Sequence, residues 1–125
     1  MLPLDPYPTN FAVRLEVAFT FHNCEIRNFA RLDQNTSLDI VSLEDRRTQI
    51  ALRDGSAMFD VGYLAPNELF EVATPQGAIN FDQPGLYNVG FDQNGGVLVS
   101  VLSGLARVVG QTGSGEINKG EMLIR

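Results

Sequence analysis

The sequence predicts an all-β fold: an antiparallel sandwich or jelly-roll-like domain of about ten short strands. Three observations support this prediction. Apolar and polar residues alternate with a period of two over residues 11–22. Turn-forming residues then recur about every ten residues, a spacing typical of sandwiches and barrels. No window of about eleven residues carries an apolar stripe with the 3.6-residue period of a helix.

The chain is predicted to begin with an extended lead-in over residues 1–10, followed by one long strand. The lead-in holds Pro3, Pro6 and Pro8, and proline lacks the backbone donor that a ladder needs. In the strand, one parity is apolar throughout and is expected to face the core: Phe11, Val13, Leu15, Val17, Phe19 and Phe21.

Two positions are open to the 11–22 strand. Its only charged residues are Arg14 and Glu16, so few charges protect it against pairing with another chain. It is therefore either a strand at or near a sheet edge, which mediates self-association or partner binding, or an interior strand that is merely long.

Shorter segments of similar character follow. The expected strands are 27–32, 37–43, 47–53, 56–62, 68–73, 77–82, 86–92, 97–102, 104–109 and 121–124. Asp54-Gly55 and Asn94-Gly95 have the composition of hairpin turns. Pro84-Gly85 forms a turn after which Tyr87, Val89 and Phe91 share a face. The glycine-rich run 110–115 is predicted to be a flexible loop.

Length and composition limit the class of protein. The 125 residues make one domain, predicted over 11–125, and 44% hydrophobic with 19% charged residues argue against disorder. The net charge of −6 argues against binding to nucleic acid or anionic lipid. No stretch reaches the roughly 18 apolar residues of a membrane span, so no membrane insertion is expected. The N-terminus has neither the basic nor the apolar region of a signal peptide.

A metal site is not expected. His22 and Cys24 would face the same way on a strand, but the spacing fixes no third or fourth ligand. One His and one Cys exclude the common closed zinc sites, and the single Cys excludes an intramolecular disulfide. The segment 33–35 resembles part of a calcium loop but lacks the remaining ligands. No metal and no cofactor are therefore predicted.

A catalytic site is not expected either. Asp60 and one of the adjacent acids Glu44-Asp45 would serve as a glycosidase-like pair only if folding brought them within roughly 5–10 Å. Gly113-Ser114-Gly115 lacks the spacing of a nucleophile elbow, and the 110–115 run is not followed by the Lys of a phosphate loop. The sequence predicts no enzyme, no catalytic residue and no cofactor-binding residue.

Five segments in order resemble one family. Arg31–Ile40 resembles the opening of FecR-type domains, which are named after the iron-dicitrate sensor. Glu71–Ala78 resembles their Val-x-Thr-Pro-x-Gly element, and Pro84–Val89 the Pro-Gly-x-Tyr-x-Val segment of a secreted FecR-like subgroup. Val97–Gly104 and Asn118–Glu121 resemble the later valine strand and the closing x-Gly-Glu.

The resemblance covers roughly residues 30–124 and implies an extracytoplasmic, periplasmic or secreted, β-domain for envelope signalling or assembly. It implies a protein partner or self-association, no nucleic acid and no catalysis, with a small ligand also possible. The family's Arg-Gly-Thr after the Thr-Pro element is replaced here by residues 80–85, and its anti-sigma helices and transmembrane helix are not seen in this chain. A β-sandwich that binds a small ligand or carbohydrate is the alternative, and a hydrolase using its acids is the third possibility.

Overall fold

The computed structural model describes residues 11–21, 24–33, 36–44, 46–65, 67–111 and 113–124, with β1 and a few other positions described in backbone only. Within these segments the chain forms twelve strands in two six-stranded sheets and no helix. The predicted all-β sandwich is therefore confirmed.

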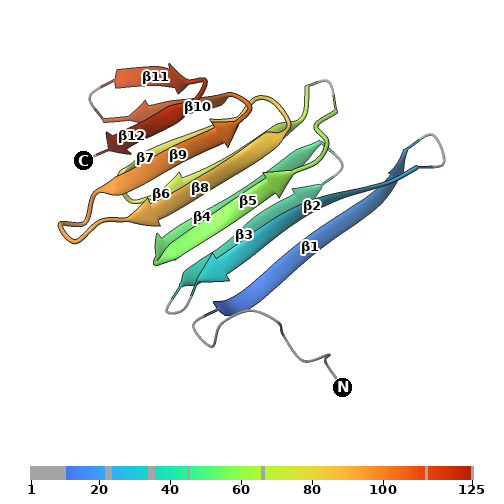
Figure 1. Ribbon diagram of the computed structural model, residues 1–125, viewed down its shortest axis with the longest axis horizontal. Coiled ribbons are helices and arrows are strands. Elements are labelled where there is room, and N and C mark those ends of the chain that lie inside the picture. The colour runs from blue at the N-terminus through green and yellow to red at the C-terminus, as the bar shows by residue number, and fades with distance from the viewer. Residues whose placement is uncertain are drawn as a thin grey trace.

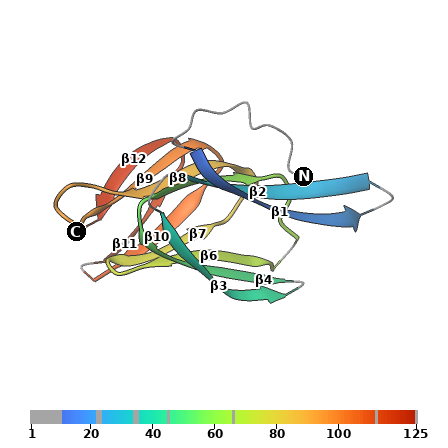
Figure 2. The same cartoon turned by 90° about the horizontal axis from the view of Figure 1, so that it is seen from below.

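The two sheets lie face to face (Figures 1 and 2). The first runs in the order β1 (Phe11–Phe21), β2 (Cys24–Asp33), β5 (Ser56–Val61), β8 (Gly85–Phe91), β9 (Val97–Ser103) and β12 (Gly120–Ile124). The second runs in the order β11 (Gly113–Ile117), β10 (Ala106–Gly110), β7 (Gly77–Phe81), β6 (Leu69–Thr74), β4 (Arg47–Asp54) and β3 (Ser37–Glu44).

The core fills the space between the sheets. Alternate residues of the central strands point inward, as the burial of Ala57, Phe59 and Val61 along β5 shows. At its centre the Phe81 ring stacks on Tyr87 at 4.1 Å and lies 5.4 Å from Phe59 between ring centroids. Aromatic side chains bury the most area per residue, so this cluster is a main source of stability.

One predicted hairpin turn is wrong. Asp54-Gly55 joins β4 to β5, and these strands lie in different sheets. Gly55 has a φ of 91° and carries the chain from one layer to the other. Because the chain passes through the first sheet before it returns as β6, β4 and β6 pair in parallel, whereas the other ladders are antiparallel. Asn94-Gly95 does lie in a hairpin, between β8 and β9.

The predicted flexible loop over 110–115 is also wrong in part. Gly113–Ile117 is strand β11, paired antiparallel with β10 from Ala106↔Ile117 to Gly110↔Gly113. Glycine and serine have low β-propensity, so the local sequence gave no strand signal. The strand forms because β10 offers it a ladder.

β1 lies at the edge of the first sheet among the described strands, which confirms the predicted edge position, whereas a role of this strand in association stays a prediction. Its ladder with β2 places Val13 opposite Leu32 and Leu15 opposite Ala30, and both of these β2 side chains are buried. The β1 side chains and the 1–10 lead-in lie outside the described residues, so the predicted core face of β1 stays a prediction.

Candidate functional site

The outer face of the first sheet is apolar near its centre. On β2, the buried Ala30 and Leu32 point inward. Phe29 and Arg31 alternate with them along the strand and therefore lie on the outer face. The same alternation places Met58 of β5 and Leu86 of β8 there. We call this surface the apolar outer face.

A small hollow lies at the centre of this face. It encloses about 90 Å³ and is lined by Phe29, Arg31, Met58, Asp60 and Leu86. The ladders explain its composition, because Asp60 pairs with both Phe29 and Leu86 while Met58 pairs with Arg31. The result is an apolar hollow with one acidic and one basic side chain in its wall.

A second hollow of about 190 Å³ follows on the same face between β5, β8 and β9. Its lining includes Ser56, Asn88 and Ser100, and the Ser56 hydroxyl donates to Asn88 Oδ1 at 3.1 Å. Gly90 leaves the floor without a side chain. This hollow therefore offers polar groups beside the apolar rim formed by Leu98.

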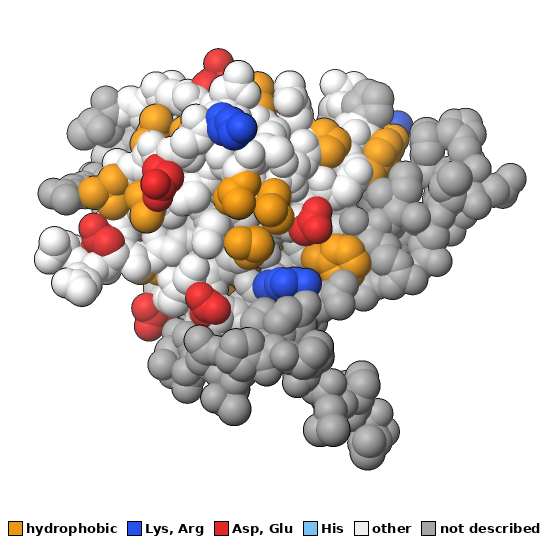
Figure 3. All heavy atoms as spheres, viewed as in Figure 1, with side chains coloured by type: hydrophobic (Ala, Val, Ile, Leu, Met, Phe, Trp, Pro, Cys, Tyr) orange, Lys and Arg blue, Asp and Glu red, His pale blue; other side chains and the backbone are white. Residues whose placement is uncertain are grey.

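Exposed leucines extend the apolar outer face toward β12. Leu102 is 48% exposed, and Leu98 lies opposite Leu123 in the β9–β12 ladder. Figure 3 shows apolar side chains gathered near the centre of the molecule in this view, with acidic and basic side chains around them. Exposed apolar groups rimmed by polar and charged residues are typical of interaction sites.

The outer face of the second sheet is polar by contrast. One row of polar side chains crosses six strands in register: Ser42, Gln49, Glu71, Asn80, Arg107 and Glu116. Gln49 Nε2 donates to Glu71 Oε2 at 2.8 Å. The neighbouring row contains Ala51, Ala73 and Ala78, which pair in turn. The side chains of this row are therefore polar on every strand from β3 to β11.

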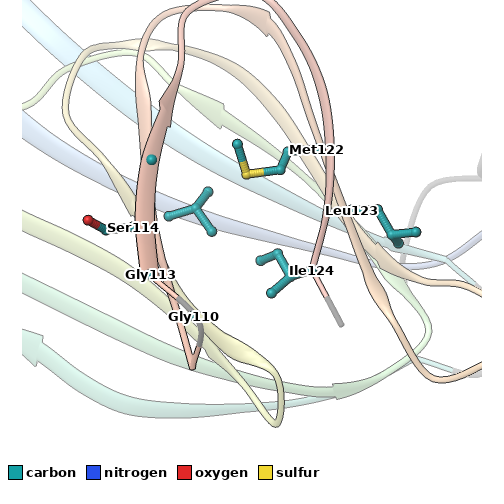
Figure 4. A pocket seen from close by; sticks show the side chains of 8 residues that line it. Gly110, Gly113, Ser114, Met122, Leu123 and Ile124 are labelled. Atoms are coloured by element: carbon teal, nitrogen blue, oxygen red, sulfur yellow. The ribbon is translucent and has the colours of Figure 1, made fainter.

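A groove opens between the free edges of the two sheets at β11 and β12 (Figure 4). It encloses about 270 Å³, and its lining residues are Val108, Gly110, Gly113, Ser114, Gly115, Met122, Leu123 and Ile124. That volume is below the usual range of about 300–1,000 Å³ for small-molecule sites. None of the lining residues is aromatic, so the groove lacks the platform on which a sugar ring stacks.

The structure places two of the acidic residues considered above, Glu44 and Asp60, in different sheets. Glu44 ends β3 in the second sheet, whereas Asp60 lies on the outer face of the first sheet. Asp45 and His22 lie outside the described residues, as do Gln34 and Asn35, and Cys24 is described in backbone only. Among the side chains that are described, no three His, Cys, Asp or Glu residues gather as metal ligands. In the same part of the chain, no helix is long and apolar enough to cross a membrane.

We expect no dependence of the fold on metal. Treatment with EDTA should leave the melting temperature unchanged, because removal of a bound metal would destabilise the folded state by mass action. Differential scanning fluorimetry with and without EDTA measures this. A drop in melting temperature that added Zn²⁺ or Ca²⁺ reverses would contradict the expectation and point to His22, Cys24 and the 33–35 turn.

Two residues of the segments that resemble FecR-type domains, Thr74 and Tyr87, have structural roles. Thr74 Oγ1 accepts from the Gln76 and Gly77 amides and donates to the Gly77 carbonyl at 2.7 Å, which closes the β6–β7 hairpin. The buried Tyr87 hydroxyl donates to the Gln83 carbonyl at 2.5 Å and accepts from the Leu105 amide at 2.9 Å. Burial raises the pKa of the Tyr87 phenol, although hydrogen bonds to the backbone at Leu105 and Gln83 oppose the shift.

The sequence prediction of interaction surfaces missed the apolar outer face. A signal was present in Val97–Leu102, where Val and Leu occupy both parities apart from Ser100. A strand that is apolar on both faces is expected where both faces are covered. Only one face of β9 is covered by the second sheet, so its leucines stay exposed.

Comparisons with known proteins agree with this architecture. The model of the FecR protein family matches residues 26–107. Two crystal structures of a candidate anti-sigma factor from Parabacteroides distasonis have the same fold with TM-scores of 0.67 and 0.68, at 16% and 15% identity. The matches cover 90% and 91% of this chain but 55% of each solved chain, so this chain spans little more than half of their length. No curated protein matches the chain.

Proposed function

Because the chain belongs to the FecR family, we propose that it is a non-enzymatic, extracytoplasmic domain for envelope signalling that binds a protein partner through its apolar outer face. The observation that carries the proposal is the exposure of Leu98, Leu102 and Leu123 on the same sheet face as the hollow at Met58. The family and the anti-sigma-factor name of the structural neighbours support a role in signalling.

The composition of the apolar outer face fits a protein partner. Aromatic residues, Met and Arg are enriched in protein–protein interfaces, and Phe29, Met58 and Arg31 surround the central hollow. A partner's anchoring side chain would fill that hollow, since binding energy is concentrated where a side chain enters a desolvated pocket. The hollow of about 90 Å³ suits one side chain better than a whole small molecule.

The proposal is tested by site-specific photo-crosslinking in cells that produce the protein. A photoreactive residue at Leu102, on the apolar outer face, should yield a protein adduct of defined mass. The same residue at Arg53, which is exposed on β4 of the second sheet, is the matched control and should yield none. Equal adducts from both positions, or none from Leu102, would refute docking on this face.

Leu102→Asp should lower the affinity for the captured partner by about tenfold or more, because it places a charge where apolar surface is to be buried. The free energy of unfolding should change by only about 0.5 kcal/mol, since Leu102 is exposed. Titration calorimetry with the captured partner and chemical denaturation measure the two effects. Heat released on titration with oligosaccharides instead would favour the carbohydrate-binding alternative.

A further inference from the structure

The sequence of β1 is symmetric about Leu15. Outward from Leu15 the pairs are Arg14 and Glu16, then two valines, two alanines and two phenylalanines: Phe11-Ala12-Val13-Arg14-Leu15-Glu16-Val17-Ala18-Phe19. The only pair that breaks the mirror consists of opposite charges. When such a strand meets a second copy of itself antiparallel, each residue lies opposite its mirror partner, and Arg14 lies opposite Glu16.

The fold leaves this strand available for pairing. β1 ends the order of the first sheet, so in the described structure only β2 pairs with it. In Figures 1 and 2, β1 lies along the outer margin of the sandwich. A long edge strand with few charges is a template for a further strand.

The hairpin of β1 and β2 also projects beyond the rest of its sheet. β5 pairs with β2 only from Asn28 to Leu32, whereas the hairpin ladder continues to Phe21↔Cys24. Among the described ladders, residues 24–27 therefore have β1 as their only neighbour. A two-stranded ribbon is marginally stable in water, and a third strand stabilises it.

Exposed apolar residues lie on the same flank of the sandwich. β3 ends the second sheet on the side where β1 and β2 end the first (Figure 2). Its Ile40, Val41 and Leu43 are 48%, 58% and 54% exposed, which makes them the largest exposed apolar group on a single described strand. Such surface next to a free strand edge is typical of an interface.

We propose that the protein forms a symmetric homodimer in which β1 pairs antiparallel with β1 of a second copy, centred on Leu15. A twofold interface requires a surface that is complementary to itself, and the mirrored sequence has this property. The first sheets of the two copies then join into one sheet of twelve strands. A strand from a different protein would need no mirror symmetry in β1, so the symmetry favours a second copy as the occupant.

The charges set the register of this pairing. Opposite charges across a ladder are favourable and like charges are unfavourable, and each dimer contains the Arg14–Glu16 pairing twice. A slip by two residues breaks both pairings. Within one copy Arg14 already lies opposite Arg31 of β2, so an acidic residue on its other side is favoured.

Charge reversal tests the proposal with the full chain by sedimentation equilibrium. The wild-type protein should form dimers, and Arg14→Glu or Glu16→Arg should each weaken dimerisation by about tenfold or more, because either change opposes like charges twice. An equimolar mixture of the two variants should form a one-to-one heterodimer. The double variant Arg14→Glu/Glu16→Arg should again form a homodimer.

Arg46→Glu is the matched control for Arg14→Glu, since it makes the same change in net charge at an exposed position outside β1 and should leave the dimer intact. Circular dichroism confirms that each variant is folded, and recovery of the heterodimer on mixing separates a lost contact from a lost fold. A wild-type protein that stays monomeric at its highest soluble concentration, or single variants Arg14→Glu and Glu16→Arg that each dimerise as strongly as the wild type, would overturn the proposal.

Discussion

Replacing Tyr87 by alanine should lower the free energy of unfolding by about 3–5 kcal/mol, the usual cost of truncating a buried aromatic side chain. Tyr87 is fully buried, and its ring stacks on Phe81 with an interplanar angle of 13°. Truncation removes this packing and leaves the Gln83 and Leu105 backbone groups without the hydroxyl that binds them. Urea denaturation followed by circular dichroism measures the loss.

The variant Tyr87→Phe separates the hydroxyl from the ring. It keeps the stacking on Phe81, so its cost should be about 1–3 kcal/mol, the penalty for leaving buried backbone groups unsatisfied. Leu102→Ala is the control for an exposed apolar truncation and should cost about 0.5 kcal/mol or less. A cost for Tyr87→Phe equal to that of Tyr87→Ala would show that the ring contributes nothing, which contradicts the packing argument.

The Tyr87 phenol also predicts how stability depends on pH. Because its pKa is raised in the folded chain by burial first and by the charge of Asp82 to a lesser degree, the phenol stays protonated at pH values where an unfolded tyrosine ionises. The stability that this group contributes is therefore fully present below about pH 10 and is lost as the pH rises further. The free energy of unfolding of the Tyr87→Phe variant should not show this loss above about pH 10.

The predictable part of the fold is the part with local signals. The alternation over residues 11–22 gave β1 within one residue of its observed end at Phe21, because strand period and strand length are both visible in the sequence. The Tyr87, Val89 and Phe91 face was also correct, since two of these are buried and Phe91 packs against the core. The mirrored sequence of β1 is likewise visible locally, although it predicts pairing with a second copy only when β1 is known to lie at a sheet edge.

The unpredicted features depend on contacts distant in sequence. Asp54-Gly55 has the chemistry of a hairpin turn, and the same chemistry serves a crossing between layers, so only the choice of partner strands decides between them. β11 is a strand because of β10, not because of its own residues. The apolar outer face could not be located because parity separates the two faces of a strand without showing which of them another layer covers.

Replacing Gly85 by alanine should cost about 3 kcal/mol, near the upper end for overpacking, because the added methyl meets backbone that cannot move aside. A Cβ at Gly85 would lie 2.1 Å from the Ser103 carbonyl oxygen and 2.8 Å from Gly104 Cα. Gly85 begins β8 directly after the chain crosses from β7 in the second sheet, at the end of the β8–β9 ladder.

Gly95→Ala is the matched control, since Gly95 has a φ of 84° but no heavy atom within 4 Å of the added methyl. It should cost only the backbone strain, about 1 kcal/mol. The two melting curves, recorded in the same buffer, separate close approach from backbone conformation as the reason for glycine in the Pro84-Gly85 turn. If Gly85→Ala were as mild as Gly95→Ala, the strands would have room to part there, and the Pro-Gly element would be needed for its turn alone.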